Sequence, residues 1–511
     1  LSKQSTVMTI TLSSGGNGEA AAPKFMLNPL VRTFQADTET PVSVYLKMQR
    51  PFSCLLESVE GEELLARFSY IAVDPVAVLK GTVGGEVSID IRDERFRALE
   101  SAIGDGRDLR GIVDRCLEAF SSAENPRSRS GSPSMTTSGV FGYFGYDTMH
   151  LVEKIPAAEQ PDPAALPDLC LLFCDTLVIF DNVMRKLFVV ANYLDEADRP
   201  RAERKIEELA ALVFEPLDRE LVPLRPELPE PVVSNTTREE YYAKVLKAKE
   251  YILSGDIFQV QVSQRLRRKL HTRPFDVYRV LRTINPSPYL YFFDCGEFHI
   301  VGSSPELLVK VERDPSGRRM VDTRPIAGTR RRGESFEDDE RIARELLSDE
   351  KECAEHLMLI DLSRNDIGRI AKIGSVETNE MMVIEKYSHV MHIVSNVRGE
   401  LQEGLSAMDA FWSCFPAGTL TGAPKVRSME IIYELEKEKR GLYGGAVGYL
   451  DFRGTLNTAI AIRTMVIRDG IIYFQAAGGI VADSTPEFEY EETMNKMRAG
   501  LTALESIETV S

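Results

Sequence analysis

The chain has 511 residues, of which 43% are hydrophobic and 27% charged, the balance of an ordinary globular protein with two or more domains or one large composite core. Its 78 acidic and 61 basic residues give a net charge of -17, which argues against nucleic-acid binding. No apolar run approaches membrane-spanning length, and seven scattered cysteines without a C-x-x-C pair indicate free thiols in a reducing cytoplasm, not disulfides or a zinc site.

The first half of the chain mixes short strands and helices. Residues 1–24 are polar and glycine-rich, and we expect a disordered tail without a signal peptide. Between 25 and 214 we expect a buried strand over 52–58, a flexible loop over 121–138, a hairpin over 177–193 and a helix over 195–213. Residues 215–236 carry five prolines and several acids, which predicts a linker.

The second half, 237–511, begins with a capping box formed by Thr237 and Glu240, which predicts a helix to about residue 254. Strands over 257–266 and 289–329 flank a helix over 274–283, and the apolar period from 336 to 360 is helical. A hairpin over 459–481, turning at Asp469-Gly470, precedes a closing helix over 486–504. Tight turns between strands, with helices inserted in blocks, favour an α+β protein with antiparallel sheets.

The stretch 323–333, TRPIAGTRRRG, predicts a strand that ends in a glycine turn among four arginines. Gly328 and Thr329 place a backbone donor beside a hydroxyl group, a plausible cradle for a carboxylate or phosphate. The alternative is a basic surface hairpin, because short motifs have high false-positive rates.

Two pairs of glutamates have helical spacing. Glu352 and Glu355 are three residues apart, as are Glu489 and Glu492, so each pair shares one helix face. Two such pairs facing each other would supply the hard oxygen ligands that Mg²⁺ prefers. The alternative is a solvated charged face, the usual place for glutamate.

Two further motifs are compatible with catalysis or with ordinary structure. In 415–427, FPAGTLTGAPKVR, a helix starting at Pro424 would point free N–H groups at an anion, although the sequence is not a P-loop and a simple helix start explains it equally. His389 and His392 are three apart, but no cysteine is near, so zinc is disfavoured and a packed or surface histidine is the alternative.

As an ordered set, the motifs resemble the chorismate-utilising enzymes, and among them the members that make anthranilate. The resemblance covers about 25–505. Its motifs are LLESVEGEE (55–63), GDIFQVQVSQR (255–265), NPSPYLYF (285–292), SSPELLVK (303–310), RPIAGTRRRG (324–333), AEHLMLIDLSRNDIGR (354–369), FPAGTLTGAPKVR (415–427), GGAVGYLDFRG (444–454) and AIAIRT (459–464).

The resemblance implies two packed, largely antiparallel sheets surrounded by helices, with an N-terminal regulatory region (25–214) interleaved with a chorismate-binding catalytic domain (237–511). It implies Mg²⁺ on Glu355 and Glu492, with Glu352 and Glu489 behind them or acting through water. Glu306 would protonate the leaving hydroxyl group, His392 would help the later loss of pyruvate as base or acid, and Thr419 would assist by a hydrogen bond. The implied substrate contacts are Gly328, Thr329, Tyr443, Arg463, Ala477, Gly478, Gly479 and Lys496.

Two positions favour amination over the reactions of relatives. Relatives that add water carry a lysine base where this chain has Gln259, and neutral ammonia needs no such base. The relative that makes aminodeoxychorismate carries a nucleophilic lysine where this chain has Ala327. One departure concerns QAAGGIV (475–481), which replaces the family's QAGAGIV and makes Ala477 the least secure substrate contact.

The resemblance also implies regulation and a partner. Ser58 and Pro288-Tyr289-Leu290 resemble a feedback site for L-tryptophan, the end product of the pathway that this reaction would open. No G-x-C-x-G elbow is present, so we expect a separate glutamine amidotransferase subunit to supply ammonia in a hetero-tetramer. The rival hypotheses are isochorismate or salicylate formation, which Gln259 disfavours, and a non-catalytic regulatory subunit, which the complete set of site residues disfavours.

Overall fold

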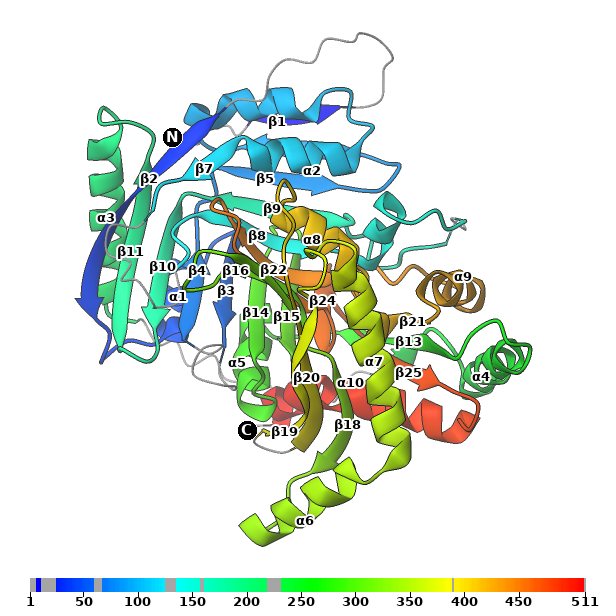
Figure 1. Cartoon of the computed structure of the whole chain (residues 1–511). Helices are drawn as coiled ribbons and strands as arrows, with labels where there is room; N and C mark the ends of the chain where they lie inside the picture. Colours follow the sequence, from blue (N-terminus) through cyan, green and yellow to red (C-terminus); the bar gives the residue numbers. More distant parts are fainter. Residues whose placement is uncertain are drawn as a thin grey trace.

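The computed structural model describes residues 6–10, 24–58, 67–124, 135–156, 160–217, 231–387 and 390–509. Within these residues the strands form two sheets, of twelve and thirteen strands. Both are largely antiparallel, with β2 and β7 forming a parallel pair, and helices surround them, as predicted (Figure 1).

The first sheet runs from the N-terminal strand to the arginine-rich stretch. Its order is β1 (Thr6–Ile10), β6 (Val87–Ile91), β5 (Ala77–Gly81), β9 (Leu169–Cys174), β8 (Gly139–Phe144), β22 (Ala446–Asp451), β23 (Leu456–Ile460), β16 (Leu307–Arg313), β17 (Arg319–Thr323), β20 (Val390–Glu400) and β18 (Ile326–Arg331), with β19 (Glu377–Lys386) also paired to β20.

The second sheet combines strands from residues 25–214 with strands from the C-terminal half of the chain. Its order is β12 (Val233–Ser234), β13 (Gln259–Lys269), β25 (Ile471–Ile480), β24 (Thr464–Arg468), β15 (Phe298–Ser304), β14 (Tyr289–Asp294), β3 (Ser53–Glu57), β4 (Phe68–Ala72), β10 (Thr176–Asp181), β11 (Lys186–Tyr193), β2 (Phe25–Gln35) and β7 (Phe120–Ser122), with β21 (Gly422–Ala423) paired to β13.

Helices connect and cover the sheets. They are α1 (Pro41–Met48), α2 (Leu109–Glu118), α3 (Arg199–Phe214), α4 (Arg238–Leu253), α5 (Pro274–Ile284), α6 (Phe336–Leu347), α7 (Glu350–Gly368), α8 (Ala407–Cys414), α9 (Lys425–Leu435) and α10 (Pro486–Thr509), with 3₁₀ turns η1 (Glu94–Ile103), η2 (Tyr146–Leu151) and η3 (Gly418–Leu420). The predicted capping box is present at α4, because Thr237 accepts from the Glu240 N–H and the Glu240 carboxylate accepts from the Thr237 N–H.

The two segments on either side of residues 215–236 share both sheets, so each sheet contains strands from 25–214 and from 237–511. A core between the sheets joins them, with Tyr70 and Phe293 of the second sheet packed in one apolar cluster with Phe141 and Leu172 of the first. The segment 25–214 is therefore interleaved with the segment 237–511 in both sheets.

Four local predictions need correction. Residues Thr6–Ile10 of the expected disordered tail form β1, because TVMTI pairs with β6; 1–5 and 11–23 lie outside the described residues. The helical stretch 336–360 is two helices, since the side chain of Asp349 caps a new one, α7. The first strand of the 459–481 hairpin is interrupted before β24, where Arg463 has φ 49°. Within the linker, Val233–Ser234 pairs with β13, and 218–230 lie outside the described residues.

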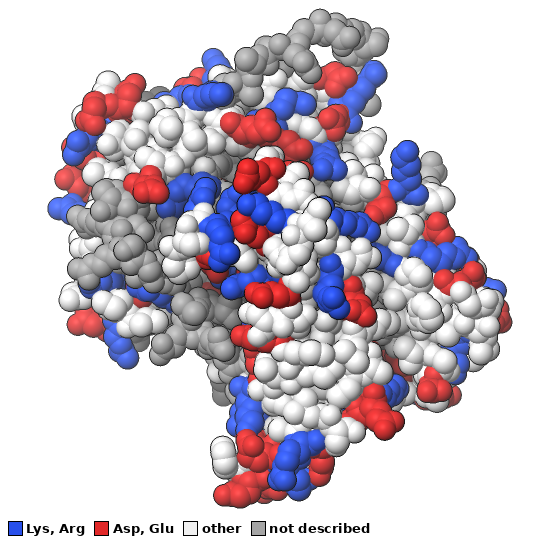
Figure 2. All heavy atoms as spheres, viewed as in Figure 1, with Lys and Arg blue, Asp and Glu red and all other residues white. Residues whose placement is uncertain are grey.

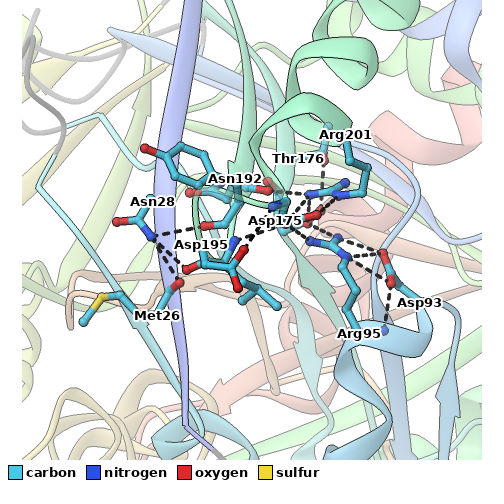
Figure 3. Close-up of polar contacts among 12 residues, drawn as sticks. Met26, Asn28, Asp93, Arg95, Asp175, Thr176, Asn192, Asp195 and Arg201 are labelled. Atoms are coloured by element: carbon cyan, nitrogen blue, oxygen red, sulfur yellow. Dashed lines mark hydrogen bonds and ion pairs between the residues drawn. The ribbon is translucent and has the colours of Figure 1, made fainter.

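A partly buried ionic network around Asp175 ties the N-terminal elements together (Figure 3). Asp175 lies between β9 of the first sheet and β10 of the second, and accepts from Arg95 of η1 at 2.9 Å. Arg201 of α3 approaches the same Asp175 oxygen at 3.4 Å. Arg201 and Arg95 also both form ion pairs with Asp198. The network links η1 and α3 at the point where the chain crosses from one sheet to the other.

The surface and the helices agree with the composition. On the face shown in Figure 2, acidic and basic side chains are interspersed. In the described part of the chain, none of the helices combines the length and apolarity that a membrane crossing needs.

Candidate active site

Most of the predicted site residues lie on β18 and β20 of the first sheet, on β25 of the second, and on α7 and α10, and hydrogen bonds and charge interactions link several of these elements. Helix α7 carries Glu352 and Glu355, and α10 carries Glu489 and Glu492, each pair on one helix face. The fold therefore brings together four carboxylates whose sequence separation concealed their proximity.

Two of the four carboxylates, Glu355 and Glu489, have a raised pKa to which their neighbours contribute. Burial raises the pKa of Glu355, and the neighbouring Glu352 and Glu492 raise it further, whereas a hydrogen bond from Gln259 opposes the rise. Burial raises the pKa of Glu489 to about 7, and Glu492 adds to the effect. Such mutual shifts require carboxylates that lie close together in a poorly solvated place.

Three of these carboxylates are held by partners of their own. Gln259 Nε2 donates to Glu355 Oε1 at 2.9 Å, Arg330 donates to Glu352 Oε1 at 2.9 Å, and Lys496 pairs with Glu492 at 2.6 Å. The fourth, Glu489, has a buried Oε2 without a hydrogen-bond partner among the described residues.

As the side chains stand, no group of three or more His, Cys, Asp or Glu within the described ranges is gathered closely enough to hold a metal ion. The chemistry of the donors nevertheless suits a hard divalent cation, since four carboxylates converge and the Glu489 oxygen is left unsatisfied. By the chemical type of their side chains, these residues suit Mg²⁺.

Glycines allow β25 to approach these carboxylates. A Cβ at Gly478 would lie 2.6 Å from Glu489 Oε2, and one at Gly479 would lie 2.9 Å from Gln259 Nε2. Ala477 precedes them with its side chain buried in the core, while its carbonyl accepts from Lys496 Nζ at 2.9 Å. Any contact of Ala477 with a substrate would consequently be made by its backbone.

The arginine-rich stretch forms one wall. Gly328 has φ 59° at a bulge between β18 and β20, and a Cβ there would meet Leu346 at 3.0 Å and Glu352 Oε2 at 3.2 Å. Its positive φ favours glycine, and its surroundings leave little room for a side chain. Arg330 of this stretch pairs with Glu352 of α7 and with Asp349, the residue that caps that helix.

His392 lies opposite Thr329 in the β18–β20 ladder, and its partners define its protonation state. Its Nδ1 is 3.0 Å from the Gly328 carbonyl oxygen and 3.0 Å from Thr329 Oγ1. A carbonyl only accepts, so Nδ1 carries the proton and Nε2 carries the free lone pair. Burial and then Arg463 lower the pKa of His392 to about 4, which keeps the ring neutral at physiological pH. His389 lies outside the described residues.

Glu306, Arg463 and Thr419 form a third group. Burial raises the pKa of Glu306 to about 8, although Thr419, Arg463 and Lys496 each oppose the rise. Thr419 lies close enough to exert that effect, yet its buried hydroxyl lacks hydrogen-bond geometry to any described residue. Burial lowers the pKa of Arg463, and no ion pair of its guanidinium is found among the described residues. The group thus combines an acid whose raised pKa favours its protonated form with a guanidinium that makes no ion pair, and a hydroxyl that makes no hydrogen bond, to any described residue.

Tyr443 completes the set. Burial raises the pKa of its hydroxyl group. The backbone of Ala477 and the carboxylate of Glu492 both lie near enough to influence that pKa, Ala477 lowering it and Glu492 raising it. The candidate catalytic, substrate and metal residues are therefore gathered in one region.

Residues 90–502 match the family model of chorismate binding enzymes. The chain belongs to this family. It is 47% identical over 492 residues to anthranilate synthase component 1 of Pseudomonas putida, covering 94% of this chain and 96% of the relative. It is 43% identical over 500 residues to the protein of that name from Acetivibrio thermocellus, covering 95% and 96%.

Solved structures agree. Anthranilate synthase component I from Streptococcus pneumoniae TIGR4 superimposes with a TM-score of 0.72 at 35% identity, covering 91% of this chain and 98% of that one. The menaquinone-specific isochorismate synthase of Escherichia coli, at 15% identity, shares the fold with a TM-score of 0.68, covering 95% and 96%. The predicted chorismate-utilising fold is confirmed.

Residues that were predicted to bind L-tryptophan also lie close together. Leu290 of β14 pairs with Glu57 of β3, next to Ser58, whose hydroxyl is buried without a hydrogen-bond partner among the described residues. Tyr289 pairs with Ser304 of β15, and the Glu306 N–H donates to Ser304 Oγ at 3.3 Å. The pairing of β14 with β15 therefore connects the predicted tryptophan site, through Tyr289 and Ser304, to Glu306.

Sequence reasoning missed several partners of these residues. Arg330 was not expected to bind Glu352, and Gln259 was chosen for its neutrality, not for its bond to Glu355. Each pair joins residues far apart in sequence on different elements, so no spacing rule in one sequence could have revealed them.

Proposed function

We propose that this protein makes anthranilate, pyruvate and water from chorismate and ammonia. The observation that carries the proposal is the group formed by Glu306, Arg463 and Thr419. It offers a carboxyl group kept protonated at neutral pH beside a cation available to a carboxylate.

We assign each of these residues a separate role in the reaction. Arg463 binds a substrate carboxylate, and Lys496, Gly478 and Gly479 form the opposite wall. Glu306 gives its proton to the ring hydroxyl group, which leaves as water while ammonia adds to the ring. His392 Nε2 then takes the ring proton, and the ring becomes aromatic as its C–O bond to the enolpyruvyl group breaks. The enolpyruvate that is released takes up a proton at its methylene carbon and becomes pyruvate. Its pKa of about 4 favours the base role over the acid role.

Mg²⁺ would be held by Glu355 and Glu492, with Glu352 and Glu489 behind them or acting through water. When bound it would neutralise a substrate carboxylate and withdraw electrons from the ring. The convergence of the four carboxylates and the unsatisfied Glu489 oxygen support this assignment.

Ammonia is favoured over water as the nucleophile. Gln259 is buried with its Nε2 committed to Glu355, so neither end of its amide can act as a base for water. Ala327, in β18, has no group that could form a covalent bond to the ring.

We further propose a separate glutamine amidotransferase subunit as ammonia source, a hetero-tetramer, feedback inhibition by L-tryptophan at Ser58 and Pro288–Leu290, and a role in tryptophan synthesis in the cytoplasm. The Ser58 hydroxyl beside β14 is buried and has no hydrogen-bond partner among the described residues, which supports the inhibitor site. If Ser58→Phe leaves inhibition unchanged, the site is misplaced.

The decisive assay is anthranilate fluorescence with purified protein, chorismate, Mg²⁺ and an ammonium salt. We expect fluorescence with ammonium, none with glutamine alone, and loss on chelation of the metal. Absence of product under all these conditions would refute the proposed function.

A further inference from the structure

A row of three side chains crosses strands β18, β20 and β19 at His392. In the ladders, His392 lies opposite Thr329 on one side and opposite Glu385 on the other. Directly paired residues project from the same face of a sheet, so Glu385 borders the imidazole on the side away from Thr329. Tyr387 follows Glu385 by two residues and lies just beyond the end of β19, so its side chain projects from the same face of the sheet as that of Glu385.

Tyr387 contacts the imidazole by its edge. The ring centroids are 5.7 Å apart and the planes are inclined at 62°. The Tyr387 hydroxyl donates to Glu385 Oε2 at 2.5 Å, so the ring is fixed by its far end as well as by packing.

Glu385 is held in turn. Arg324 Nε donates to its other carboxylate oxygen, Oε1, at 3.1 Å, and the same guanidinium pairs with Glu380 at 2.8 Å. Both oxygens of Glu385 are thus engaged by Tyr387 and Arg324, which leaves the carboxylate poorly placed to draw a proton onto the imidazole beside it.

The main chain of Tyr387 is fixed as well. Its N–H donates to the Val390 carbonyl at 2.8 Å, and Arg332 Nη1 donates to its carbonyl oxygen at 2.6 Å. Arg324 and Arg332 belong to the arginine-rich stretch, so two of its arginines support the residues around His392.

We propose that Tyr387, braced by Glu385 and Arg324, is a positioning residue that holds the imidazole of His392 with Nε2 facing the substrate. An unsupported imidazole can turn about its Cβ–Cγ bond and exchange the places of its two nitrogens. The Gly328 carbonyl and Thr329 fix one edge of the ring, and Tyr387 blocks its rotation. This inference rests on the proposed function, because it concerns the step that follows amination.

The test separates the two chemical steps in Tyr387→Leu and in the milder Tyr387→Phe. Misplacing His392 slows loss of pyruvate but not amination, so Tyr387→Leu should release or accumulate an aminated compound that retains the enolpyruvyl group. We expect the ratio of that compound to anthranilate to rise about tenfold, a fraction of what a general base contributes. Tyr387→Phe keeps the packing and should show a smaller rise.

Tyr433→Phe is the matched control. Tyr433 also packs edge-on against a histidine, His150, at 5.3 Å, and also donates to a carboxylate, Asp147, at 2.5 Å. Its variant should leave the product ratio unchanged.

An independent readout is ¹⁵N NMR of the imidazoles, with His392 assigned by its loss in His392→Gln. The wild-type ring should show the Nδ1–H tautomer, and Tyr387→Leu should show a mixture. If wild-type protein makes no anthranilate, the proposed function fails. If it does, and Tyr387→Leu slows both steps equally with an unchanged tautomer, the positioning role alone is refuted.

Discussion

Glu306 should destabilise the folded protein at neutral pH, and Glu306→Gln should relieve the cost. Burial raises the pKa of this carboxyl group from its ordinary 4.5 to about 8 in the folded state. Between these values the folded protein holds a proton that the unfolded chain has released, so the free energy of unfolding falls as pH rises.

The size of the effect follows from the shift. Each pH unit within this window costs about 1.4 kcal/mol, so the loss reaches roughly 3 kcal/mol by pH 7 and on the order of 4–5 kcal/mol by pH 8. Glutamine has nearly the same shape and no charge to desolvate. Glu306→Gln should therefore match the wild type near pH 4.5 and exceed it increasingly towards pH 8, while anthranilate formation falls by about 10²–10⁴.

Urea unfolding at pH 5, 6, 7 and 8 measures this difference. The single tryptophan, Trp412, is 5% exposed and provides the fluorescence signal. Glu403→Gln serves as the control, because that side chain is 92% exposed and should give no pH-dependent difference. A stability difference between Glu306→Gln and wild type that stays constant from pH 5 to pH 8 would show that Glu306 is ionised in the fold.

Three further predictions concern the site. Gly478→Ala should lower anthranilate formation at least about tenfold, because its Cβ would lie 2.6 Å from a carboxylate oxygen, whereas Gly368→Ala, with open space around its Cβ, should be neutral in the same assay. Arg463→Lys should raise the KM for chorismate by about tenfold or more, since lysine cannot form a bidentate pair; an unchanged KM would exclude carboxylate binding there. Gln259→Leu removes the hydrogen bond that lowers the pKa of Glu355, so that pKa should rise further and Mg²⁺ affinity, measured by calorimetry, should weaken more at pH 6 than at pH 8.

Two local features of the fold were predicted correctly from the sequence. The capping box at Thr237 and the hairpin around Asp469-Gly470 formed as predicted, because each depends on contacts within a few residues. The break at Asp349 was missed, since apolar periodicity continues through it while the aspartate side chain caps the next helix. The strand at Thr6–Ile10 was missed because only its partner, β6, gives it pairing.

By itself, the sequence determined the kinds of groups available: paired glutamates, a glycine that tolerates positive φ, and the uncharged side chains of Gln259 and Ala327. Those properties belong to single residues and short spacings. Only the tertiary structure decided which groups meet. It placed Gln259 on Glu355, Arg330 on Glu352 and Tyr387 on His392, and it buried Glu306 deeply enough to keep its proton. Desolvation and pairing across distant strands arise from the packing of whole elements, which no local pattern encodes.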